Sequence, residues 1–89
     1  MESNTYRSYL YISGIPKWKR QVMTTRLLYM DLPDDTHIDD KLRLNVRKYV
    51  DTLKFREVNA IELVMFKVTN NNMVDLNDRL SFRIWSKEL

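Results

Sequence analysis

One stretch of this 89-residue chain has the apolar spacing of an α-helix, whereas the segments on either side are patterned as strands. Within residues 36–54 an apolar side chain recurs every three or four positions, which forms one continuous stripe on a helix. The stripe consists of Ile38, Leu42, Val46, Tyr49 and Leu53. Thr36 is expected to cap the first turn, with Asp39 three residues further on. Because one helix covers only one face of a sheet, a two-layer α+β fold is expected.

The first and last strands are predicted from their aromatic content and their alternation. Residues 5–13 are rich in aromatic and β-branched side chains, and Gly14 and Pro16 then supply a turn. Residues 79–87 alternate along their length, as a half-buried strand does. The side expected to face the helix carries Leu80, Phe82 and Ile84. The other side carries Ser81, Arg83, Trp85 and Lys87.

Residues 17–31 fit two patterns. Apolar spacing that starts at Trp18 fits a helix, whereas alternate side chains from Met23 onwards fit one face of a strand. The adjacent Thr24 and Thr25 lose rotamer freedom in a helix, which favours the strand.

Residues 58–68 are rich in Val, Ile, Leu and Phe, and form either a strand or a continuation of the helix. Residues 69–78 are typical of a loop. With a strand at 58–68 the element order is ββαββ, in which two hairpins flank the helix. Residues 1–89 are then one small α+β domain, an antiparallel four-stranded sheet with one amphipathic helix on one face.

Composition excludes several classes of site. The single glycine rules out glycine-rich phosphate loops, and the absence of cysteine rules out disulfides and thiolate metal sites. His37 is the only histidine, so a histidine-based catalytic triad cannot form within one chain. Acidic residues near the start of the predicted helix, such as Asp39 and Asp40, favour the helix dipole and need no metal. The chain is therefore predicted to be no enzyme and to hold no metal or cofactor.

The sequence is expected to be cytoplasmic. Its longest apolar run, Leu63 to Phe66, is far shorter than a membrane span, and its first five residues lack the pattern of a secretory signal. No contact with a membrane or with a small-molecule substrate is expected.

The sheet face opposite the helix is the candidate binding surface. It is expected to carry Arg7, Tyr9, Tyr11, Arg26, Arg83, Trp85 and Lys87. Aromatic and basic side chains together stack on bases and bind phosphates, and they also form the energetic centre of protein interfaces. Val22, Leu28 and Met30 are expected on the same side, and their apolar character favours a covering protein. The alternative is that a loop or a second helix buries this face as ordinary core.

Charge is distributed unevenly on the chain, although the net charge is only +3. One basic turn with an aromatic residue, fit to contact a phosphate backbone or an acidic partner, consists of Lys17, Trp18, Lys19 and Arg20. The alternative for this turn is a solvated loop in which Trp18 folds back onto the core. An acidic stretch, residues 31–40, contains five aspartates and no Lys or Arg.

Residues 10–16, LYISGIP, resemble the first-strand motif of RNA-recognition-motif domains. The second motif of that family needs glycines and paired aromatics, whereas residues 63–68 contain no glycine. The predicted order ββαββ also differs from the βαββαβ order of that family. The chain is accordingly not assigned to it.

These patterns lead to two functional hypotheses. The first is a small non-enzymatic binding or regulatory protein that acts through protein contact on the open sheet face, either by self-association as a homodimer or by blocking a partner. Its size would suit a compact accessory factor, including one from a virus or a mobile element. The second is a basic protein that binds single-stranded RNA or DNA through the same face.

Overall fold

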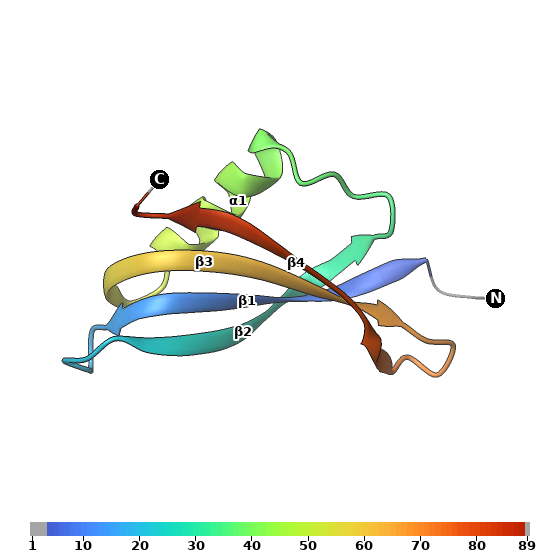
Figure 1. Ribbon diagram of the computed structural model, residues 1–89, viewed down its shortest axis with the longest axis horizontal. Helices are drawn as coiled ribbons and strands as arrows, with labels where there is room; N and C mark the ends of the chain where they lie inside the picture. Colours follow the sequence, from blue (N-terminus) through green and yellow to red (C-terminus); the bar gives the residue numbers. More distant parts are fainter. Residues whose placement is uncertain (1–3, 89) are drawn as a thin grey trace.

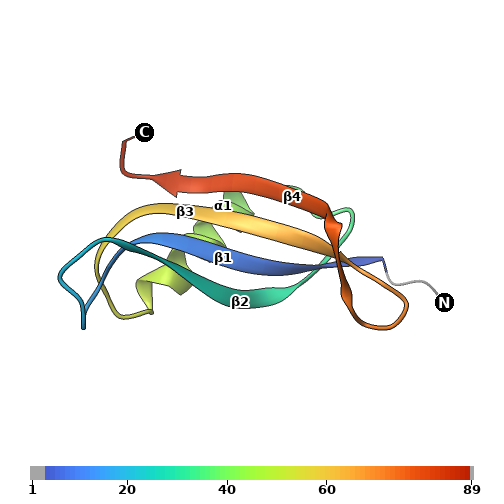
Figure 2. The same ribbon diagram turned by 60° about the horizontal axis from the view of Figure 1, so that its bottom comes forward.

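The computed structural model describes residues 4–88 and contains four strands and one helix in the order ββαββ (Figure 1). The strands are β1 (Thr5–Pro16), β2 (Met23–Pro33), β3 (Phe55–Val68) and β4 (Val74–Ser86), and the helix is α1 (Asp40–Asp51). All strand pairs are antiparallel, and the strand order in the sheet is β2-β1-β3-β4 (Figure 2). The predicted α+β class and element order are confirmed.

The strand interpretation of the two ambiguous segments is confirmed. Of the segment 17–31, residues 23–31 lie in β2, and residues 58–68 form all of β3 except its first three residues. The loop expected at residues 69–78 is shorter, because β4 already begins at Val74. Asn72 adopts a positive φ of 60°, which asparagine tolerates, and its N–H donates to the carbonyl of Thr69. A tight turn therefore replaces the predicted loop.

The helix begins later than its apolar spacing indicates. Asp39, not Thr36, is the N-cap: its carboxylate accepts a hydrogen bond from the N–H of Leu42 at 2.9 Å. The N–H of Thr36 instead donates to the carbonyl of Pro33 and closes a turn. A carboxylate satisfies the free N–H groups of a helix start and also favours its positive dipole end, so Asp39 displaces the predicted cap.

The core lies between α1 and the two central strands. It is formed by apolar side chains that alternate along β1 and β3, by two valines of α1, and by single residues of β2 and β4. The fully covered members are Leu10, Ile12, Ile61, Leu63, Val46 and Val50. Within residues 4–88, no helix is long and apolar enough to cross a membrane.

Gly14 is required by a close approach of β1 to β3. The register of these strands shifts between Ser13 and Gly14, so that Gly14 lies opposite Val58. A Cβ atom at Gly14 would overlap the backbone carbonyl oxygen of Glu57, which cannot move without disturbing the sheet. Glycine is therefore needed here for space within the strand. The turn that the sequence predicted at Gly14 and Pro16 is wrong, because β1 runs to Pro16 and the turn follows it.

We predict that Gly14→Ala lowers the free energy of unfolding by about 1–3 kcal/mol, because the added methyl group displaces a sheet backbone. Urea denaturation followed by circular dichroism measures the change. Ser13→Ala is the matched control and should remain within about 0.5 kcal/mol of the parent protein. Equal stabilities for the two variants would contradict the proposed overlap.

Tyr29 of β2 and Tyr49 of α1 connect the edge of the sheet to the helix. Their ring centroids lie 5.4 Å apart at an interplanar angle of 54°. Burial raises the pKa of the Tyr29 phenol above its ordinary value of 10.0, and the neighbouring Tyr49 raises it further. The folded protein therefore holds the phenolic proton more tightly than the unfolded chain does.

We predict that this stabilising effect is complete below about pH 10 and is lost as the pH rises through the raised pKa of Tyr29. Thermal unfolding between about pH 9 and 11 tests it, since Tyr29→Phe should lose less stability than the parent protein over this range. Tyr11→Phe, on the other face of the sheet, is the control and should follow the parent. A Tyr29→Phe curve parallel to that of the parent would contradict the prediction.

Candidate binding face

The sheet face opposite α1 carries a group of arginine and aromatic side chains, which we call the arginine face. Because Leu10 and Ile12 point to the helix, the odd-numbered residues of β1 between them and beside them point away from it. The strand register then places neighbours on the same face, with Tyr9 opposite Leu28 and Val64. The arginine face consists of Arg7, Tyr9, Tyr11, Arg26, Phe66, Arg79 and Arg83.

Stacked rings and guanidinium groups cover the centre of this face. The ring of Tyr9 meets that of Phe66 edge-on, with centroids 5.9 Å apart and an interplanar angle of 75°. Arg26 lies over the ring of Tyr9 at 5.4 Å, and Arg79 lies over that of Phe66 at 5.7 Å. Phe66 is consequently only 8% exposed and Val64 only 3%, although no helix covers them.

The four arginines of the face differ in their partners. Arg7 forms an ion pair with Asp31 at 3.3 Å, and Arg83 lies 3.9 Å from Glu62. Among the described residues, no carboxylate lies within ion-pair distance of Arg26 or Arg79. Within residues 4–88 the face therefore has two guanidinium groups that lie over aromatic rings and form no ion pair.

Five of the residues predicted for the open face lie on it. They are Arg7, Tyr9, Tyr11, Arg26 and Arg83. The sequence interpretation missed Phe66 and Arg79. Phe66 belongs to a segment whose pattern also fits a continuation of the helix, and Arg79 is only the first residue of the predicted last strand. The alternation of Glu62, Val64 and Phe66 was the signal for this part of the face.

Trp85 was predicted on the open face, and this placement is wrong. The register of β3 and β4 shifts between Ile61 and Glu62, so that Trp85 lies opposite the core residue Ile61. Trp85 packs against the core, and the guanidinium of Arg47 in α1 lies over its ring at 4.3 Å. A β-bulge changes which side of the sheet the following residues face, and the even alternation of residues 79–87 concealed it.

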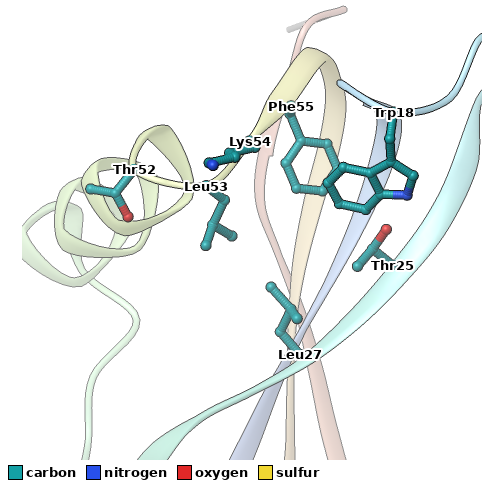
Figure 3. A pocket seen from close by; sticks show the side chains of 7 residues that line it. All are labelled: Trp18, Thr25, Leu27, Thr52, Leu53, Lys54 and Phe55. Carbon is teal, nitrogen blue, oxygen red and sulfur yellow. The ribbon is translucent and has the colours of Figure 1, made fainter.

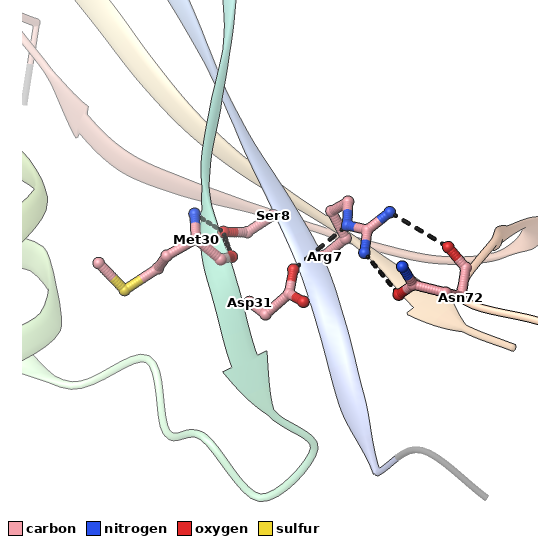
Figure 4. Close-up of polar contacts among 5 residues, drawn as sticks. All are labelled: Arg7, Ser8, Met30, Asp31 and Asn72. Atoms are coloured by element: carbon pink, nitrogen blue, oxygen red, sulfur yellow. Dashed lines mark hydrogen bonds and ion pairs between the residues drawn. The ribbon is translucent and has the colours of Figure 1, made fainter. Parts of the chain in front are cut away.

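Met30 was also predicted on the open face, but it lies at a bulge that interrupts the alternation of β2. Leu28 lies on the open face as predicted. The register of β1 and β2 shifts between Arg7 and Tyr9, and the hydroxyl of Ser8 binds both the N–H and the carbonyl of Met30 (Figure 4). In the same view Arg7 contacts Asp31 and Asn72, which ties β1 to the β3–β4 turn.

Lys87, which was also predicted for the open face, directly follows the end of β4 and forms an ion pair with Glu57 at 3.5 Å.

The predicted basic turn lies at one end of the molecule, between β1 and β2. Lys17, Lys19 and Arg20 are exposed there, and Trp18 is 67% exposed, so it does not fold back into the core. Trp18 borders a mostly apolar pocket of about 360 Å³, together with Thr25 and Leu27 of β2, Leu53 of the α1–β3 turn and Phe55 of β3 (Figure 3). This pocket lies on the helix side of the sheet, so the turn and the arginine face are separate sites.

The aspartates do not gather into a metal site. Within residues 4–88, no three side chains of the ligating types His, Cys, Asp and Glu lie close enough together to hold a metal ion. Asp31 and Asp34 instead form ion pairs with Arg7 and Lys67, and Asp39 caps the helix.

Comparison of the chain with protein-family models, with curated proteins and with solved structures finds no match.

We predict that Trp85→Ala lowers the free energy of unfolding by about 2–3 kcal/mol, because it removes a ring that packs on the core and on Arg47. Trp18→Ala is the matched control and should cost less than about 1 kcal/mol, since Trp18 is mostly exposed. Chemical denaturation measures both. Equal losses for the two tryptophans would contradict the position of Trp85 under the helix.

Proposed function

We propose that this chain is a non-enzymatic binding protein that contacts an acidic surface of another protein through its arginine face. The observation that supports the proposal is the pair formed by Arg26 and Arg79. Each guanidinium lies over an aromatic ring and has no carboxylate partner among the described residues.

Stacking prepares these two arginines for binding. An arginine that rests on an aromatic ring has already lost much of its rotamer freedom, so a partner's carboxylate orders it at little further cost. The planar guanidinium keeps its N–H groups at its edge, where they can donate two parallel hydrogen bonds to a carboxylate. Arginine and tyrosine are also the residue types that dominate binding energy in protein interfaces.

Charge on the face favours a different protein over a second copy at this site. The face carries four arginines, and among the described residues Asp31 and Glu62 form ion pairs with two of them. Two such faces brought together would place guanidinium groups of like charge against one another, which costs free energy unless they are neutralised. An acidic partner removes that cost.

Single-stranded nucleic acid is the second candidate, favoured by the combination of arginines with Tyr11 on adjacent positions of the sheet. Base stacking needs an accessible ring face. Arg26 and Arg79 lie over Tyr9 and Phe66, and Phe66 is only 8% exposed. A base could stack there only by displacing a guanidinium, so a carboxylate that binds the guanidinium edges is the better match.

The proposal is tested by fluorescence anisotropy with a labelled oligoglutamate peptide and a labelled single-stranded RNA of the same charge. We expect Arg26→Gln/Arg79→Gln to weaken peptide binding about tenfold or more, because it removes two charge-assisted contacts. Lys41→Gln/Lys48→Gln, which removes the same charge from exposed positions of α1, should weaken it less than about threefold.

Two outcomes would overturn the proposal. Equal weakening by both double variants would mean that the peptide responds only to net charge. Tighter binding of the RNA, with a steep dependence on salt and a loss in Tyr11→Ala, would establish the nucleic-acid function instead.

A further inference from the structure

We infer that the free edge of β2 pairs with β2 of a second copy, in antiparallel orientation and centred on Thr25. The two four-stranded sheets would then form one continuous sheet across a two-fold axis. This interface is the edge of the sheet, and is separate from the arginine face. A failure of this inference would leave the proposed function untouched.

The strand order leaves two edges, β2 and β4, and they are treated differently. The guanidinium of Arg43 in α1 donates hydrogen bonds to the carbonyls of Arg83 and Ile84, which occupies part of the β4 edge. On β2 the bulge at Met30 is bound inward by Ser8 of β1 (Figure 4). Residues 23–28 thus form a regular edge whose outward backbone groups have no strand beside them.

This edge lacks the usual protection against pairing. Natural edge strands are guarded by lysines, prolines or inward-facing charges. Between residues 21 and 30 the only charged residue is Arg26, and there is no proline. Val22, Met23 and Leu28 are 53%, 40% and 59% exposed. The strand therefore presents both unpaired backbone and exposed apolar side chains.

The hydroxyl of Thr25 fixes the register. Its oxygen is buried, has no hydrogen-bond partner among residues 4–88, and points towards the pocket beside Trp18 (Figure 3). Pairing centred on Thr25 places the two Thr25 side chains opposite each other on the helix side of the sheet. Opposite Cβ atoms in an antiparallel pair are about 4.5–5.5 Å apart, within reach of a hydrogen bond between two threonine hydroxyls after a χ1 rotation.

The same register pairs apolar side chains on both faces. Met23 lies opposite Leu27 on the helix side, and Val22 lies opposite Leu28 on the other side. Because Leu27 borders the pocket of about 360 Å³, Met23 of the second copy reaches its mouth, where a flexible methionine fills irregular space well. A register centred on Arg26 would instead place two arginines directly opposite each other, which is destabilising.

Charges at the two ends of β2 also favour the antiparallel pairing of two copies. The basic turn precedes β2, and the acidic stretch begins at its end, so antiparallel pairing brings each basic turn beside the acidic stretch of the other copy. Among the described residues, Lys19 and Arg20 have no ion-pair partner, and neither does Asp35. Two-fold symmetry forms this contact twice.

The test is a charge swap followed by sedimentation equilibrium over a range of concentrations. The parent protein is expected to dimerise. Lys19→Glu/Arg20→Glu alone and Asp34→Lys/Asp35→Lys alone should each weaken dimerisation about tenfold or more, because like charges then meet at both ends. An equimolar mixture of the two variants should restore association to within about threefold of the parent, since every contact again joins opposite charges.

Lys41→Glu/Lys48→Glu on the exposed side of α1 is the matched control and should dimerise as the parent does. All these substitutions lie at exposed positions, and circular dichroism verifies that the fold is kept. As an independent readout, amide exchange at residues 23–28 should slow as the protein concentration rises. A parent protein that stays monomeric, or a mixture that fails to restore the dimer, would overturn the inference.

Discussion

The structure depends on the fact that one short helix must cover a four-stranded sheet. The helix residues Val46 and Val50 belong to one buried cluster whose other members come mostly from the two central strands, β1 and β3. In the part of the chain that the structure describes, the other face of the sheet has no second layer and is covered by its own side chains. Arg26 and Arg79 lie across Tyr9 and Phe66, and this arrangement removes Phe66 from water while keeping charge at the surface.

Because the single helix is short, it contacts the two edges of the sheet differently. The helix is tied to β4 through Arg43, and it is stacked on Trp85 of the same strand through Arg47. At the opposite edge Tyr49 contacts Tyr29 of β2. Towards the start of β2, Thr25 and Leu27 border the pocket beside Trp18, and within residues 4–88 no strand lies beside the outer edge of β2.

Sequence patterns predicted the elements better than they predicted the faces. The apolar spacing of residues 36–54 identified the helix, and alternation together with the paired threonines identified β2, because both signals depend on local geometry. The face to which a side chain points follows from strict alternation along its strand. Bulges near Trp85 and Met30 interrupt this alternation. They arise from pairing with a neighbouring strand, which has no local sequence signal. For the same reason Phe66 and Arg79 could be recognised as neighbours only once β3 and β4 were aligned.

The arrangement of charge also decides how copies of this chain can meet. Four arginines on the open face oppose the stacking of one sheet on another, although the rings beneath them are apolar. Between residues 21 and 30 of the β2 edge Arg26 is the only charged residue, and a register centred on Thr25 avoids placing the two copies of Arg26 directly opposite each other. Repulsion on the face and complementarity along the edge therefore act together. In the proposed dimer they would direct self-association to the strand edge and would leave the arginines available for the acidic partner proposed for that face.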